Sequence, residues 1–140
     1  MIHFEYDTSY PMPENWNETK TIAWINACLE KFQVQCNQLI INFLDDKSLL
    51  QVNQSVFNRD YLTDTISMAY QEGTNLYSGT VYISLERVYE NAIQHNVSYH
   101  DELLRVIIHS FLHIIGYDDS TRDERERMRC LEDLCMDYYS

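Results

Sequence analysis

The stretch "HSFLHIIGYDD", residues 109–119, sets two histidines four residues apart in an apolar run, followed by a glycine and two aspartates. Histidines at i and i+4 share one face of a helix, so their imidazoles can bind one ion. Gly116 can adopt the left-handed conformation that ends a helix. The chain can then reverse and bring Asp118 or Asp119 over the histidines, and Asp119 gives the spacing H-x3-H-x5-D.

The helix that carries the histidines is expected over residues 99–115 and is apolar nearly all round, which is typical of a buried helix. Its polar exceptions are Glu102, Arg105, His109, Ser110 and His113. At about 100° per residue, all of them except Ser110 fall on one narrow stripe. A buried polar group without a partner costs about 1–3 kcal/mol, so this stripe needs partners. A histidine bonded to the backbone of the core is one solution, and a shared metal ion is the other.

A carboxylate is a competent third ligand beside two imidazoles, and three protein ligands leave a coordination position for water. A structural zinc site would use four protein ligands, and no cysteine lies near enough in sequence to supply the fourth. We therefore predict one divalent metal ion, most readily Zn²⁺, on His109, His113 and Asp119. Asp118 either supports these ligands from outside the metal's coordination sphere or braces the turn.

The 140 residues are the size of one domain, and we expect a single domain over residues 1–140. The net charge of −12 argues against non-specific binding to nucleic acid or to an anionic membrane. The start of the chain lacks the basic and apolar regions of a signal peptide, and no window has the ~20 apolar residues of a membrane helix. The expectation is a cytoplasmic protein with reduced thiols, without a membrane partner or a small-molecule cofactor.

Periodicity and turn residues predict an α+β fold, a small mixed sheet of about four strands covered by helices, with the metal site on the buried helix and the turn after it. Strands are expected over residues 2–6, 37–45, 63–73 and 78–88, the last two as an antiparallel pair. Helices are expected over residues 17–32, 47–57, 99–115 and 121–139. In the last helix acids interleave with four arginines, which indicates a solvated face with salt bridges: Arg122, Arg125, Arg127 and Arg129.

The stretch 109–119 resembles the signature H-G-x-L-H-L-x-G-Y-D-H of the YbeY family. Six positions match: His109, Leu112, His113, Gly116, Tyr117 and Asp118. Ser110 stands where the family usually has glycine, and Asp119 where it usually has its third metal-binding histidine. Two further segments resemble the family's "N…D-x-x-T-D-V-L-S-F" and "G-D-I-x-I-S" motifs, namely "NQSVFNRDYLTDTISM" at 53–68 and "GTVYIS" at 79–84.

This resemblance implies a single-strand-specific, metal-dependent endoribonuclease of rRNA maturation, acting at the 3′ end of 16S rRNA and in ribosome quality control. It also implies ribosomal RNA and the small ribosomal subunit or its assembly factors as partners. The family usually has an arginine in the column that holds Phe57, and Arg59 stands two residues on. Arg59, Arg87 and Arg105 are candidates for phosphate contact. No general base is evident.

Two alternatives remain at this point. The spacing H-x3-H-x2-G-x2-D also resembles the ligand run of a small zinc protease, but such enzymes use a Glu after the first His as general base, where this chain has Ser110. The second alternative is a non-catalytic ribosome-assembly module, in which the metal only holds the helix and the turn together.

Overall fold

The structure, a computed structural model, describes residues 1–139 of the chain. Within them the elements run in the order β1 (Ile2–Tyr6), α1 (Glu18–Phe32), β2 (Gln35–Leu44), α2 (Asp46–Phe57), β3 (Thr65–Gly73), β4 (Leu76–Ser84), α3 (Leu85–His95), α4 (Tyr99–Ile114) and α5 (Arg122–Met136). The strands form one sheet in the order β1-β2-β4-β3. Strand β3 is antiparallel to β4, whereas the other neighbours are parallel. The predicted α+β class with a small mixed sheet is confirmed.

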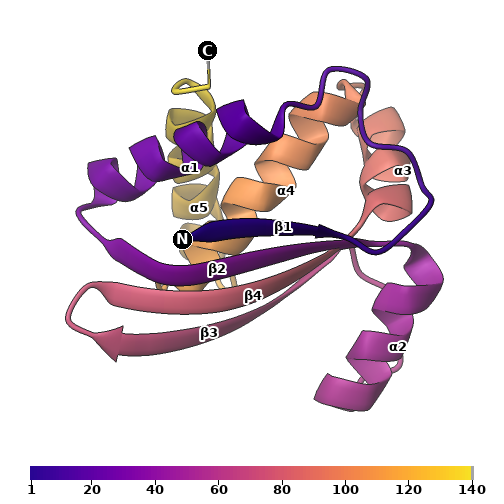
Figure 1. Cartoon of the computed structure of the whole chain (residues 1–140), viewed down its shortest axis with the longest axis horizontal. Helices are drawn as coiled ribbons and strands as arrows, with labels where there is room; N and C mark the ends of the chain where they lie inside the picture. Colours follow the sequence, from indigo (N-terminus) through magenta and orange to yellow (C-terminus); the bar gives the residue numbers. More distant parts are fainter. Residues whose placement is uncertain (140) are drawn as a thin grey trace.

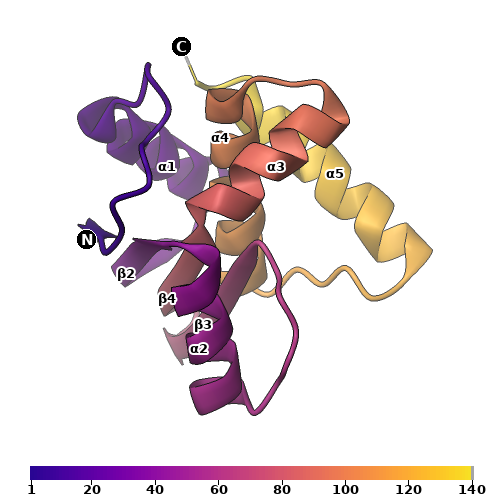
Figure 2. The same cartoon turned by 90° about the vertical axis from the view of Figure 1, so that its right-hand side faces the viewer.

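Helices α1, α3 and α4 lie on one face of the sheet, and α2 lies on the other (Figure 1). Helix α5 packs along α4, and the chain between them loops away from the helix layer before α5 returns (Figure 2). The parallel pairing of β1 and β2 requires a long crossover, and α1 supplies it. The sheet is thus covered chiefly on the face where α4 lies.

Helix α4 is the centre of the hydrophobic core, as its apolar sequence predicted. Eight of its apolar side chains are buried: Leu103, Leu104, Val106, Ile107, Ile108, Phe111, Leu112 and Ile114. They pack with the buried side chains of β2, β4, α1 and α3 in one cluster. Among residues 1–139, no helix combines the length and the apolar character needed to cross a bilayer.

The register of the sheet explains where a cleft can form beside α4. Ile41 of β2 pairs with Val81 of β4, and both are buried in the core, but Ser67 of β3 continues the same row at the edge of the sheet. The neighbouring rows also end on β3 with small side chains, Thr65 and Ala69. Because the edge strand carries no large apolar side chains on this face, the space between β3 and α4 is left unfilled.

Helix α3 was not predicted, and its first residues were assigned wrongly to a strand. The expected strand over residues 78–88 ends at Ser84, whose hydroxyl accepts a hydrogen bond from the backbone N–H of Arg87 and caps α3. Leu85, Val88 and Ala92 then follow at helical spacing and are buried. The error arose because the apolar residues on both sides of Ser84 fit either period over a short window.

Helix α2 and the loop after it form the second wall of the cleft. Leu49 of α2 packs on the far face of the sheet with Leu44 and Ile66. The helix ends at Asn58 in the left-handed conformation, and the loop of residues 58–64 leads into β3. Asn53, which is buried in α2, donates from Nδ2 to the carbonyl oxygen of Tyr61 at 2.8 Å. This bond ties the loop to the helix and so fixes the position of the residues between them.

Candidate metal centre and its cleft

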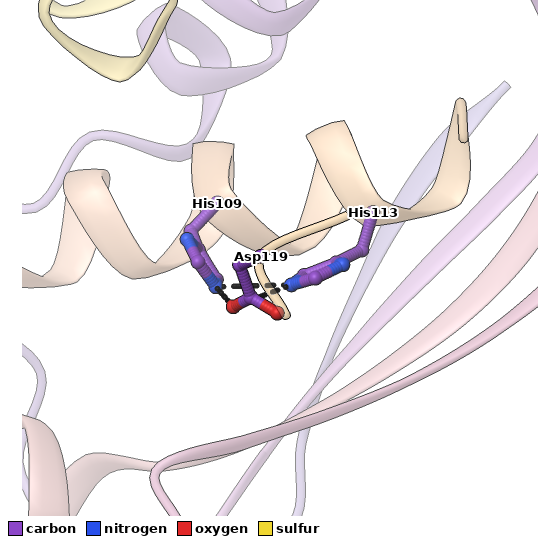
Figure 3. A group of neighbouring side chains, drawn as sticks. All are labelled: His109, His113 and Asp119. Atoms are coloured by element: carbon purple, nitrogen blue, oxygen red, sulfur yellow. Dashed lines mark hydrogen bonds and ion pairs between the residues drawn. The ribbon is translucent and has the colours of Figure 1, made fainter. Parts of the chain in front are cut away.

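His109, His113 and Asp119 converge at the end of α4 (Figure 3). The two histidines lie one turn apart on α4, with 3.1 Å between their Nε2 atoms. Oδ2 of Asp119, from the loop that follows α4, lies 3.2 Å from Nε2 of His113 and 3.4 Å from Nε2 of His109. Three potential ligand atoms therefore form a nearly equilateral triangle.

The size of this triangle fits a tetrahedral zinc-like ion. With bonds of about 2.0–2.1 Å, the ligand atoms of such an ion lie about 3.3 Å apart. Nitrogen and carboxylate oxygen are both zinc ligands, and three of them form one face of the tetrahedron. The side chains of His109, His113 and Asp119 are 28%, 29% and 41% exposed, so the fourth position would face solvent. Within residues 1–139, His109, His113 and Asp119 form the one group of three such side chains whose ligand atoms lie close enough together to hold a metal ion.

The turn after α4 brings Asp119 back because each of its steps is held locally. Gly116 has φ = 105°, the conformation that the sequence predicted for it. The N–H of Tyr117 donates to the carbonyl of Leu112 at 3.0 Å and closes the turn. Helix α5 then starts at the predicted capping box of Thr121 and Glu124. Asp119 thus sits on a short connection that is fixed at both ends.

Glu132 of α5 is part of the centre, and the sequence analysis missed it. Its Oε2 lies 2.6 Å from Nδ1 of His109, and its Oε1 accepts a hydrogen bond from Arg105 at 3.1 Å. A carboxylate on Nδ1 keeps the proton there and leaves the lone pair of Nε2 directed at the metal position. The available signal was a buried acid on an apolar stripe, because Glu132 shares a face of α5 with Met128 and Cys135.

The charge around His109 favours its protonated form when no metal is bound. Burial by itself lowers the pKa of the His109 imidazole, but the hydrogen bond and charge of Glu132, with the charges of Asp119 and Asp64, outweigh burial and raise that pKa above its ordinary value. A divalent cation would interact with the same carboxylates. The surroundings of His109 are therefore built for positive charge.

A cleft of about 480 Å³ opens between the candidate ligand atoms and β3. One wall carries His109, His113 and Asp119, and the floor is formed by the small side chains of β3. The opposite wall is the end of α2 and the loop after it, with three larger side chains: Phe57, Arg59 and Tyr61. The guanidinium carbon of Arg59 lies 5.4 Å from the centroid of the Phe57 ring, a cation–π distance.

The structure distributes the predicted phosphate-contact residues unevenly. Arg59 lines this cleft together with His109, His113 and Asp119. Arg105 instead bonds Glu132 and Asp133 of α5, and it borders a smaller hollow of about 160 Å³ beside His109. Arg87 is paired with Asp46 at 2.8 Å and does not line the cleft.

Asp118 and Ser110 differ in their surroundings. Asp118 is exposed on the turn, so its proposed supporting role stays a prediction. Ser110 is fully buried, and its hydroxyl donates to the carbonyl of Val106 at 2.8 Å while accepting from Thr65 at 2.8 Å. The bond with Thr65 joins α4 to the edge strand β3, and the bond to Val106 lies within α4. Ser110 is thus engaged in packing and is not available as the base of a protease.

Comparison with known proteins agrees with the motifs. The family model described as Endoribonuclease YbeY matches residues 4–140. The endoribonuclease YbeY of Flavobacterium psychrophilum is 38% identical over 133 residues, which are 95% of this chain and 92% of that protein. The endoribonuclease YbeY of Bacteroides fragilis is 39% identical over 117 residues, 84% of each chain.

Among solved structures, the solution structure of TM1509 from Thermotoga maritima superposes with a TM-score of 0.63. The match covers 98% of this chain and 90% of that one at 20% identity, so this likeness bears on the fold alone. The family assignment rests instead on the family model and on the curated relatives, which match over most of their own length. Together with the motif at residues 109–119, they identify this chain as a member of the YbeY endoribonuclease family.

Proposed function

We propose that this protein is a metal-dependent endoribonuclease that hydrolyses phosphodiester bonds in single-stranded RNA. The observation that carries the proposal is the cleft itself, which has three potential metal ligands on one wall and a guanidinium group and two aromatic rings on the other. The curated relatives are named endoribonucleases, which agrees with this chemistry.

The proposed cofactor is a single divalent ion, most readily Zn²⁺, on His109, His113 and Asp119. Two imidazoles and a carboxylate at tetrahedral spacing support zinc more than magnesium or calcium, which prefer oxygen ligands. When bound, such an ion would acidify a water molecule and polarise a phosphoryl oxygen. The role of Glu132 is to hold His109 in the orientation and tautomer that binding requires.

Arg59 is the proposed phosphate-binding residue of this cleft. A guanidinium group can bind two phosphate oxygens at once, and the ring of Phe57 restrains it on the cleft wall. Phe57 and Tyr61 offer ring faces on which unpaired bases can stack. Paired bases have no free faces of this kind, which supports a preference for single strands. We assign Arg105 to the support of Glu132 rather than to direct substrate contact.

We further propose ribosomal RNA as the substrate, at the 3′ end of 16S rRNA, with the small ribosomal subunit or its assembly factors as partners. The support for this step is membership in the YbeY family. A net charge of −12 also disfavours loose binding to RNA in general, so a structured partner that presents the strand fits the protein better. Such a substrate would place the protein in the cytoplasm.

The two alternatives explain fewer observations. A protease would need a general base after His109, and Ser110 is buried and bonded to Thr65 and Val106. A purely structural metal would be better enclosed, whereas the side chains of His109 and His113 are more than a quarter exposed and line an open cleft. Both features favour a catalytic centre.

The test compares His113→Ala with His3→Ala, a histidine on β1 at the opposite edge of the sheet from β3. Cleavage of a labelled single-stranded RNA, its loss with a chelator and the thermal midpoint are measured for each protein. We expect His113→Ala to lose cleavage and bound metal with little change in melting of the metal-free form, and His3→Ala to behave as wild type. Unfolding of His113→Ala at ambient temperature would favour the structural role, and undiminished cleavage would refute the proposal.

A further inference from the structure

A second pocket, of about 390 Å³, opens on the other side of the metal centre from the Arg59 cleft. His109 and Asp119 line both of them, so the two hollows meet at the metal-binding atoms. The far wall of the second pocket is α5, which contributes three arginines: Arg122, Arg125 and Arg129. We refer to this hollow as the α5 pocket.

The three arginines reach the α5 pocket because of their spacing. Positions 122, 125 and 129 are i, i+3 and i+7, which lie on one face of a helix. The remaining arginine of this run, Arg127, is on another face, where its guanidinium carbon lies 5.6 Å from the centroid of the Tyr117 ring. The sequence alone indicated one solvated, salt-bridged face for all four arginines. In the structure three of them face the α5 pocket and Arg127 lies on another face of the helix.

Two of the three guanidinium groups have no acidic partner in the part of the chain that the structure describes. Within residues 1–139, Arg122 pairs with Glu126 at 3.2 Å, whereas no carboxylate lies within ion-pair distance of Arg125 or Arg129. The pocket has two other acids: Glu132 is engaged by Arg105 and His109, and Asp119 lies beside His109 and His113. Arg125 is held at the rim because its Nη1 donates to the carbonyl of Ser120, next to Asp119.

Among the described residues, arginines without an acidic partner line both pockets, although the chain has a net charge of −12. A small anion bound at the metal would contact the arginines of one pocket only. A strand of RNA carries a phosphate at every nucleotide, so it would present phosphates to Arg59 on one side and to Arg125 and Arg129 on the other. Both pockets are open, as a strand that passes through them requires.

We propose that the α5 pocket binds the RNA backbone on the side of the cleaved bond opposite to the nucleotides held in the Arg59 cleft. This inference rests on the proposed nuclease function. The strand would cross the metal centre, with its bases stacked near Phe57 and Tyr61 on one side and its phosphates held by Arg125 and Arg129 on the other. Contacts to phosphates position a strand without reading its sequence.

The test compares Arg125→Ala/Arg129→Ala with Arg127→Ala/Lys47→Ala, which removes the same charge from outside the pocket. Lys47 is exposed on α2, on the opposite face of the sheet from α4. Metal-free protein, which cannot cleave, is titrated with a fluorescent single-stranded RNA over a range of salt concentrations. The pocket variant should lose about 1.4 from the slope of log Kd against log salt, at roughly 0.7 per phosphate contact, and should bind unrelated sequences more weakly by similar factors.

A charge-preserving variant, Arg125→Lys/Arg129→Lys, guards against a folding artefact and should keep most of the salt slope, because lysine also binds phosphate as a point charge. Equal slopes in the pocket variant and its control would overturn the inference. The cleavage assay separates this result from failure of the nuclease itself. If the wild type cleaves RNA and the pocket variant keeps the wild-type slope, only the α5 pocket is refuted. If the wild type does not cleave but the pocket variant has a lowered slope, the nuclease function is refuted and RNA binding in the α5 pocket is retained.

Discussion

Replacement of Glu132 by Gln isolates the contribution of one buried charge to the metal centre. The Glu132 side chain is 9% exposed, and its Oε2 lies 2.6 Å from Nδ1 of His109. Glutamine has nearly the same volume, and its carbonyl oxygen can still accept the hydrogen bond from Nδ1. The substitution therefore removes the negative charge while the contact with His109 and the packing of α5 on α4 are preserved. The amide nitrogen takes the place of Oε1 and cannot accept from Arg105, so this hydrogen bond is lost as well.

The expected effect is a loss of metal affinity. Removal of a carboxylate that supports a metal-bound histidine costs about 10–100-fold in affinity, or roughly 1.4–2.7 kcal/mol. A hydrogen bond to a charged acceptor is roughly twice as strong as a neutral one, so Glu132→Gln should retain part of the interaction. We expect metal affinity to fall about 10-fold in Glu132→Gln and nearer 100-fold in Glu132→Ala, which removes the hydrogen-bond acceptor entirely.

The assay is chelator competition for Zn²⁺ at mildly alkaline pH, where the neutral, metal-binding imidazole predominates. Asp133→Asn is the matched control, because it removes the other carboxylate partner of Arg105 without a contact to His109. Its affinity should stay near that of wild type. If Glu132→Gln bound zinc as tightly as wild type while metal-free melting was unchanged, Glu132 would not orient His109. Equal losses in both variants would assign the effect to Arg105.

Three further outcomes are expected. Asp119→Ala should lose stoichiometric metal by elemental analysis and Asp119→His should keep it, since His is the family's usual third ligand; retained metal in the alanine variant would exclude Asp119. Gly79→Ala should destabilise by about 1–3 kcal/mol in urea unfolding, because an added Cβ would lie 2.5 Å from Cδ1 of Ile114, and Ile114→Ala should make the double variant less destabilised than the sum of the two. Burial raises the pKa of the Glu102 carboxyl above its ordinary value, and this effect outweighs the lowering by the cationic neighbours His95 and Arg105. The contribution of Glu102 to stability is therefore fully present below the pKa of the unfolded chain and is lost as pH rises through the pKa of the folded protein. Glu102→Gln should therefore gain stability relative to wild type from acidic to neutral pH in the same assay, and a relative loss would contradict this sign.

The sequence analysis was most accurate where the deciding interactions are local. The boundaries of α4, the left-handed Gly116 and the capping box of Thr121 all depend on residues within one or two turns of each other. The convergence of His109 and His113 follows from the helical repeat alone. Helix α3 was missed because a buried strand and a buried helix look alike over the few residues around Ser84, and only their packing distinguishes them.

The sequence by itself determined which residues form the candidate metal centre, because a helical repeat, a glycine turn and a carboxylate lie within 11 consecutive residues. The tertiary structure decided what surrounds it. Glu132 lies 23 positions after His109, and Arg59 precedes it across three intervening elements, β3, β4 and α3. Both reach the centre only because α5 packs on α4 and because the edge strand β3 leaves a cleft beside it. Contacts of this kind depend on how distant elements pack, and local periodicity carries no information about that packing.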